Sequence, residues 1–99
     1  MDFDWDGAKS SRNVRERGLP FELATLLFSS PTLEASDDRK DYGERRVRAY
    51  GEIRGRVLVC VFTDRHESGR LLRRIISLRK ANSREAREYN EWLKVEESG

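Results

Sequence analysis

The segment Arg56–Phe62, RVLVCVF, constrains the fold more than any other part of the chain. Its unbroken run of apolar residues leaves no polar face, which is typical of a strand covered on both sides of a sheet. The flanking stretches GEIRG and TDRHESG are of hairpin length and contain glycine, so antiparallel neighbours are expected at Arg46–Gly51 and Leu71–Arg79. We therefore predict a sheet with Arg56–Phe62 as its central strand.

Two helices are predicted near the start of the chain, after a short edge strand at Phe3–Trp5. Asp6 suits the N-cap of a helix over residues 7–16, and Gly18 suits its C-terminal end because glycine adopts the left-handed conformation most easily. A second helix would begin near Pro20, since proline is favoured in a first helical turn. Its apolar residues recur at helical spacing on one face: Phe21, Ala24, Leu27 and Phe28.

A further helix is predicted at the end of the chain. Asn82 and Glu85 have the spacing of a capping box, and the helix would run toward Lys94, with residues 95–99 frayed. With another short strand at Thr32–Ala35, the element order is two helices, several strands and a helix. We expect an α+β fold in a single domain over residues 1–99, a length that suits one modest core.

Composition excludes several classes of function. Cys60 is the only cysteine and His66 the only histidine, so neither an internal disulfide nor a zinc site built from these residues is available. Cys60 is expected in the core and His66 in a polar hairpin loop. No apolar run reaches the roughly 18 residues of a membrane span, and no signal peptide is evident. We expect a cytoplasmic protein with no membrane partner, no metal and no cofactor.

Basic residues gather around the end of the last strand. Six lie between positions 70 and 84 with no acid among them: Arg70, Arg73, Arg74, Arg79, Lys80 and Arg84. Alternation predicts that Arg73 and Arg79 share a face and that Arg74 lies on the other. The planar fork of arginine suits phosphate, so nucleic acid would satisfy these charges. A solvated surface, or pairing with Glu85, Glu88 or the acids between positions 34 and 44, is the alternative.

Two stretches at opposite ends of the chain resemble the BrnT toxin family. FDWDGAKSSRNVRERGLPFELATLLF is similar to the family's opening signature, and RIISLRKANSREAREY to its closing one. The resemblance implies a ribonuclease toxin of a type II toxin–antitoxin pair that inhibits translation, with a RelE-like architecture of helices packed on a curved antiparallel sheet. It also implies a DNA-binding, BrnA-like antitoxin, RNA as substrate, and operator DNA contacted only through the toxin–antitoxin complex.

One departure from the family pattern concerns catalysis. The family usually has Lys-His-Gly where this chain has Glu16, Arg17 and Gly18, so a histidine role there would be lost. Chemistry without metal or histidine is available, because the RNA 2′-hydroxyl can attack the adjacent phosphate once it is aligned and the developing charge is stabilised.

The residues expected to carry this chemistry lie mostly in the closing signature. For catalysis they are Arg79, Lys80, Arg84, Glu85 and Tyr89, and for RNA binding Arg45, Arg46, Arg73 and Arg74. Arg79 ranks first, while Glu85 is either a base or a capping residue and Tyr89 either a proton donor or a core residue. A nucleic-acid-binding module without catalysis, or a decayed partner that only holds an antitoxin, is the alternative function.

Overall fold

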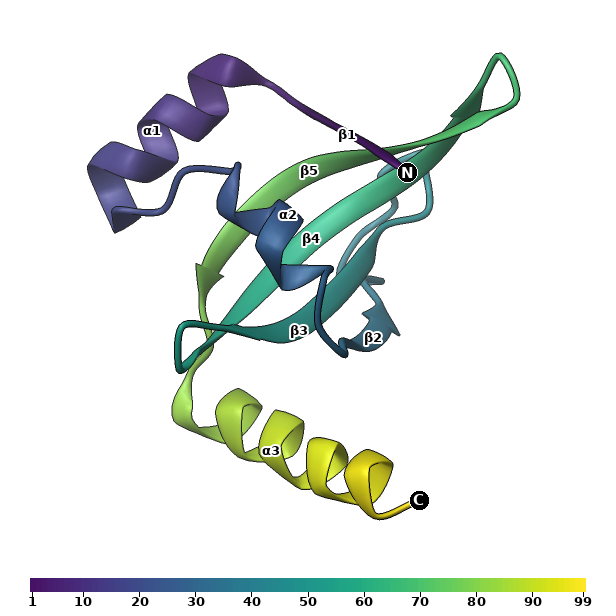
Figure 1. The fold of residues 1–99 in the computed structure, drawn as a ribbon. Coiled ribbons are helices and arrows are strands. Elements are labelled where there is room, and N and C mark those ends of the chain that lie inside the picture. The colour runs from purple at the N-terminus through teal and green to yellow at the C-terminus, as the bar shows by residue number, and fades with distance from the viewer.

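The computed structural model describes residues 1–99 as a five-stranded sheet with three helices (Figure 1). In chain order the elements are β1 (Asp2–Trp5), α1 (Gly7–Arg17), α2 (Leu23–Leu27), β2 (Leu33–Ser36), β3 (Val47–Ile53), β4 (Arg56–Glu67), β5 (Arg70–Lys80) and α3 (Ser83–Ser98). The strands are arranged β1-β5-β4-β3-β2, so β4 is central, as its apolar sequence predicts. None of the helices combines the length and apolar character needed to cross a membrane.

The first strand makes the sheet mixed. β1 pairs in parallel with β5, with Asp2 opposite Leu72 and Trp5 opposite Ile75, whereas the other neighbours are antiparallel. The expectation of a purely antiparallel sheet is therefore wrong at this edge. Hairpin-length connections predict antiparallel neighbours only for consecutive strands, and β1 pairs with a strand from the far end of the chain.

Two tight turns join β3 to β4 and β4 to β5. Each places a residue and then a glycine at positive φ: Arg54 at 52° and Gly55 at 81°, Ser68 at 53° and Gly69 at 76°. Such two-residue turns match the twist of the flanking strands. β4 and β5 are consequently longer than the sequence predicts, and His66 lies exposed in β4 instead of in a loop.

The N-terminal helices follow the sequence in part. The Asp6 side chain accepts hydrogen bonds from the backbone N–H groups of Ala8 and Lys9, and Gly18 ends α1 at φ 72°, as expected. The second helix is shorter than expected, because Phe21 and the residue after it form a turn and α2 begins only at Leu23.

The main core lies between the sheet and the helices α1 and α2. It consists of Leu19, Phe21, Ala24, Leu27, Ala49, Ile53, Leu58, Cys60, Phe62, Ile75 and Leu78. Gly51 allows α2 to approach β3 closely, since a Cβ there would lie 2.7 Å from the Cγ of Leu27. Cys60 is a core residue as predicted, and burial raises the pKa of its thiol to about 12.

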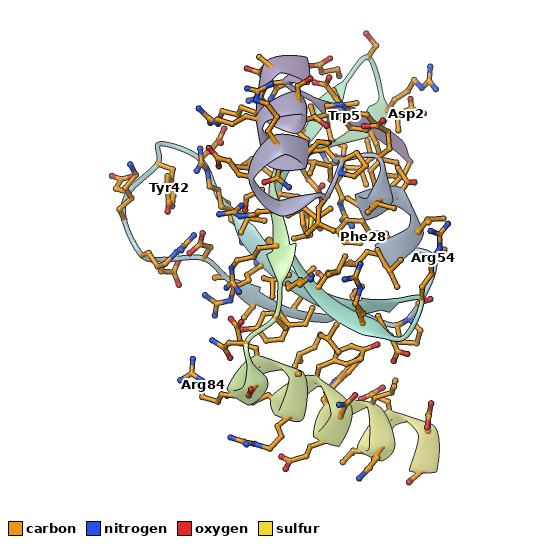
Figure 2. The ribbon with its side chains drawn as sticks, turned by 90° about the vertical axis from the view of Figure 1, so that its left-hand side faces the viewer. Asp2, Trp5, Phe28, Tyr42, Arg54 and Arg84 are labelled. Carbon is orange, nitrogen blue, oxygen red and sulfur yellow. The ribbon has the colours of Figure 1, made fainter.

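The opposite face of the sheet is covered only at one end. There, Tyr89 of α3 packs with Tyr50 and Val59 in a second, smaller core. The capping box of Asn82 and Glu85 is present, and α3 continues through residues 95–98. Above α3 no helix covers this face, which we call the open face; Figure 2 shows Phe28 on one side of the sheet and Tyr42, in the loop before β3, on the other.

A β-bulge in β5 changes which arginines share a face. Val61 of β4 pairs with Ser77, but its neighbour Phe62 pairs with Ile75, so Ile76 is an extra residue. Because a bulge shifts the alternation by one residue, Arg79 lies on the open face together with Arg74, and Arg73 lies on the helix-covered face. The prediction that Arg73 and Arg79 share a face is wrong, since it assumed a regular strand.

Candidate functional site

Most of the basic residues around β5 are paired with carboxylates. The ion pairs are Arg70–Asp2, Arg73–Asp64, Arg74–Asp4, Arg79–Glu85 and Arg84–Glu88. The acids come from β1, β4 and α3, which the fold brings alongside β5. The alternative of pairing with Glu85 or Glu88 is thus confirmed for Arg79 and Arg84, whereas the pairs with Asp2, Asp4 and Asp64 were not expected. Of the six cations only Lys80 forms no ion pair.

The four predicted RNA-binding residues separate into two pairs. Arg45 and Arg73 line a cavity of about 220 Å³ beside Phe62 on the helix-covered face. The Arg73 guanidinium is held by Asp64 at 2.8 and 2.9 Å and lies 3.9 Å from the centre of the Phe62 ring, and its side chain is only 12% exposed. Arg73 therefore acts as a packing residue with an occupied fork.

Arg46 and Arg74 line a different hollow, of about 160 Å³, next to the start of α1. The Arg46 guanidinium lies 3.8 Å from the centre of the Tyr42 ring and pairs with Glu44 at 3.2 Å. Lys9 of α1 reaches the same hollow. Arg46 and Arg74 therefore lie next to α1, a helix whose basic residues were not predicted to belong to the site.

A basic groove runs between α1 and β5. It consists of three adjoining hollows of about 160, 270 and 400 Å³: Lys9 and Ile76 line the first two, and Glu16 and Arg17 line the last two. Its cations are Lys9, Arg12, Arg17, Arg46, Arg65, Arg74, Arg79 and Lys80, against the acids Asp6, Glu16 and Glu44. We call this feature the α1–β5 groove; Figure 2 looks directly onto α1.

The helix supplies the cations that sequence reasoning missed. Lys9 and Arg12 form no ion pair, and Arg17 donates at 3.0 Å to the side-chain oxygen of Asn13. Lys9, Arg12 and Glu16 are spaced at i, i+3 and i+7, which places them on one side of a helix. That spacing is the signal that could have revealed this wall of the groove.

Asn13 fixes α1 against the sheet. Its Nδ2 donates to the carbonyl oxygens of Leu19 at 2.7 Å and of Leu78 at 2.9 Å, and the residue is only 6% exposed. Leu78 lies on the outer edge of β5 beyond the point where β1 stops pairing. Asn13 therefore supplies, past the end of β1, a hydrogen bond to the edge of β5 that a longer β1 would have made, and so links the two walls of the groove.

Both carboxylate oxygens of Glu85 accept hydrogen bonds within the fold. The Arg79 guanidinium and the backbone N–H of Asn82 lower the pKa of the Glu85 carboxyl to about 2, although burial opposes the shift. Tyr50 adds a long hydrogen bond of 3.5 Å from its hydroxyl. A carboxylate with so low a pKa is a poor proton acceptor near neutral pH, so capping and clamping are the roles that its geometry supports.

Arg79 keeps one edge free. Three of the five N–H groups of a guanidinium are used, two by Glu85 through Nη1 and Nη2 and one by the carbonyl oxygen of Lys80. The Nε–H and the second Nη2–H form the side-on fork, and no hydrogen bond occupies them. The Nε of Arg79 has no hydrogen-bond partner within the protein. It is also not buried, since the only buried side-chain polar atom without a partner is the Nε of Arg48.

The other predicted catalytic residues lie in different surroundings. Lys80 is exposed beside Arg79 in the third hollow of the groove. Tyr89 is 1% exposed, its hydroxyl donates to the Pro31 carbonyl oxygen at 3.1 Å, and burial raises its pKa. Arg84 is exposed on α3, 3.9 Å from Glu88. Neither Tyr89 nor Arg84 lines the groove, and no three His, Cys, Asp or Glu side chains gather where they could hold a metal ion.

Comparison with known protein families places the chain in a defined class, the ribonuclease toxins of type II toxin–antitoxin systems. A family model described as the ribonuclease toxin, BrnT, of type II toxin–antitoxin systems matches residues 5–85. Because the match spans most of the chain, the protein belongs to the BrnT family of ribonuclease toxins, and a type II system implies an antitoxin partner. No curated protein shows significant sequence similarity to the chain.

Proposed function

We propose that this chain is an endoribonuclease toxin that cleaves cytoplasmic RNA without a metal ion and so inhibits translation. The observation that carries the proposal is the α1–β5 groove, which lies within the family-matched residues 5–85. Lys9 and Arg12 on its wall have no acid partner, and Arg79 offers a free fork at its end. Unpaired cations along a groove suit the phosphates of a single RNA strand.

The RNA itself supplies the nucleophile. Attack of a 2′-hydroxyl oxygen on the adjacent phosphorus breaks the bond to the 5′-oxygen and leaves a 2′,3′-cyclic phosphate. The protein need only align these atoms and stabilise the charge that develops on the phosphate oxygens. We assign the stabilisation of this negative charge to Arg79, Lys80 and Arg17, the three cations that line the third hollow.

Proton transfer requires a different group. Arginine does not lose its proton near neutral pH, so Arg17 cannot perform the transfer expected of the family's histidine. Glu16 lines both larger hollows among these cations. We assign it the role of general base, which accepts the proton of the attacking 2′-hydroxyl. The departing 5′-oxygen takes a proton from water. Glu16 thus replaces Glu85, which Arg79 already occupies.

Incubation of the purified protein with RNA, with and without a chelator, tests the proposal. Cleavage that persists with the chelator, yields cyclic phosphate ends and fails on RNA lacking the 2′-hydroxyl supports it. Cleavage that the chelator abolishes would overturn metal independence. Binding without cleavage would favour a binding module, and neither activity would favour a decayed partner of the antitoxin.

The implied antitoxin completes the proposal. We expect a BrnA-like, DNA-binding protein that neutralises the toxin, represses their shared operon together with it, and provides the only contact with operator DNA. Membership of a type II family supports this expectation, and the arrangement of helices on a sheet is compatible with a RelE-like architecture. Expression of the toxin alone should arrest growth, and co-expression of the antitoxin should restore it.

A further inference from the structure

One buried polar side-chain atom in the chain has no hydrogen-bond partner, the Nε of Arg48. Arg48 lies on β3 opposite Val61 of β4, so its side chain is on the open face of the sheet. Its guanidinium forms no ion pair and lies 5.8 Å from the centre of the Tyr50 ring. Buried donors are nearly always paired in native proteins, so this N–H marks a place where a partner is expected.

Two carboxylates in the neighbourhood of Arg48 already have partners. Asp37, whose side chain is completely buried, binds the side-on fork of Arg39 at 2.7 and 2.9 Å, and Glu85 binds Arg79. The backbone N–H of Asp37 donates to the carbonyl oxygen of Arg46 at 2.8 Å, two residues before Arg48 on β3. Tyr50, whose ring centre lies 5.8 Å from the Arg48 guanidinium, donates from its hydroxyl to Glu85, so both carboxylates lie in the neighbourhood of Arg48. The charge of Arg48 also helps to hold the pKa of Asp37 below its usual value. Three arginines therefore share two carboxylates, and one positive charge is left over.

We propose that Arg48 is the centre of a phosphate subsite on the open face, flanked by Arg39 and Arg79, which binds an RNA phosphate away from the bond that is cleaved. The assignment to RNA rests on the proposed function. A phosphate is compact, carries the charge that the cluster lacks and accepts hydrogen bonds from several guanidinium groups at once.

The position of Arg79 connects this subsite with the α1–β5 groove. The bulge in β5 turns Arg79 to the open face, and Arg79 also lines the third hollow of the groove. An RNA strand can therefore pass from the groove across the end of β5 and onto the open face without losing contact with a cation. Arg48 extends the phosphate path by one step beyond Arg79.

The first experiment detects the subsite without RNA. Titration of the full chain with inorganic phosphate at constant ionic strength should shift the NMR signal of the Arg48 Nε–H group and then saturate. The signal of Arg56, an exposed arginine at the start of β4, serves as the control and should not move. An unchanged Arg48 signal would overturn the subsite, whether or not the protein cleaves RNA.

The second experiment tests the RNA assignment. Binding of a 2′-O-methylated RNA, which cannot be cleaved, is measured over a range of salt concentrations for Arg48→Gln and for the matched control Arg56→Gln. Loss of one phosphate contact should weaken binding severalfold and reduce the slope of log affinity against log salt by about 0.7, whereas Arg56→Gln should leave both unchanged. Circular dichroism confirms that each variant is folded, and Arg48→Lys should recover part of the affinity.

The two experiments separate the possible failures. A phosphate-induced shift together with an unchanged salt slope in Arg48→Gln would leave an anion site but overturn its role in RNA binding. A wild-type chain that binds no RNA, yet shows the phosphate shift, would overturn the proposed function and the RNA assignment while the phosphate site stands. An equal loss of RNA affinity in Arg48→Gln and Arg56→Gln would mean that each variant acts only through the net charge of the protein. That result would overturn the role of the subsite in RNA binding.

Discussion

Arg79 and Glu85 are joined by two parallel hydrogen bonds, from Nη1 to Oε1 at 2.8 Å and from Nη2 to Oε2 at 2.9 Å. Arg79 is the second-to-last residue of β5 and Glu85 lies in the first turn of α3, so the pair fixes the direction in which the helix leaves the sheet. Arg79 also lines the third hollow of the α1–β5 groove. A substitution of Arg79 will therefore change both the stability of the fold and the binding of RNA.

Arg79→Ala should lower stability as well as activity. It leaves Glu85, whose side chain is 6% exposed, without its cation. We expect a loss of about 1–3 kcal/mol in the free energy of unfolding, less than for a fully buried pair because the Arg79 side chain is 36% exposed. Urea denaturation measures the first effect and RNA cleavage the second.

Glu85→Gln provides the control for that variant. It should also destabilise the protein, because it breaks the ion pair, but it leaves Arg79 free to bind phosphate. RNA binding should therefore survive Glu85→Gln and be reduced in Arg79→Ala. Equal loss of RNA binding in both variants would mean that Arg79 acts only by anchoring α3.

Stability should fall in acid through Glu85. Its folded pKa of about 2 lies below the ordinary value of 4.5, so the ion pair stabilises the fold fully above pH 4.5. The contribution is lost as the pH falls from about 4.5 toward 2, and it amounts to about 2–3 kcal/mol. Urea midpoints of the wild type and Glu85→Gln should therefore converge at low pH. A constant difference across this range would contradict the assignment.

Arg12→Ala should weaken RNA binding without unfolding the chain. Arg12 lines the second hollow of the groove and forms no ion pair, so its loss should reduce the salt slope by about 0.7 and leave the melting temperature nearly unchanged. Arg15→Ala is the matched control, since Arg15 is exposed on the same helix but does not line the groove. If both variants bind RNA equally, the groove is not the binding surface.

Asn13→Ala should detach α1 from β5. The change leaves the carbonyl oxygen of Leu19 without its donor and that of Leu78 with only a long bond of 3.5 Å from Arg17, which we expect to cost about 1–3 kcal/mol. Hydrogen exchange should show the backbone amides of α1 opening more often than those of β4. Asn13→Asp should be at least as damaging, because a carboxylate cannot donate a hydrogen bond to these oxygens. Unchanged protection of α1 in both variants would refute this role.

Gly51→Ala should disturb the contact between α2 and β3. The added methyl group would lie 2.7 Å from the Cγ of Leu27, a branched atom held in the main core. Overpacking of this kind costs about 1–3 kcal/mol. The double variant Gly51→Ala with Leu27→Ala should lose less than the sum of the two single changes, as measured by urea denaturation. Strict additivity would show that the two residues do not compete for space.

The sequence predicts the elements of this fold better than their partners. The apolar run in β4 identifies the central strand, and Asp6 and Gly18 mark the ends of α1, because these signals are local. The parallel pairing of β1 with β5 joins distant segments through backbone hydrogen bonds, which leave no mark in either sequence. The bulge at Ile76 is likewise invisible, since it depends on register with β4.

The candidate site shows the same division. Arg79 and Lys80 were recognised from local charge, and the structure places both beside the groove. Pairing with Glu85 was foreseen as an alternative, but the partners of Arg70, Arg73 and Arg74 were missed because their carboxylates come from β1 and β4. Lys9 and Arg12 were missed because their spacing shows that they share one side of α1 but does not show that this side faces β5.

The pairing of the first strand with the last has a consequence for the growing chain on the ribosome. α1 is synthesised before β5, the strand that forms the opposite wall of the groove, and three strands are made between them. A nascent chain that ends before β5 has one row of cations on a helix and no surface to hold that helix in place. The cationic groove is therefore assembled only after β5 has been made, and termination before that point yields a fragment without it.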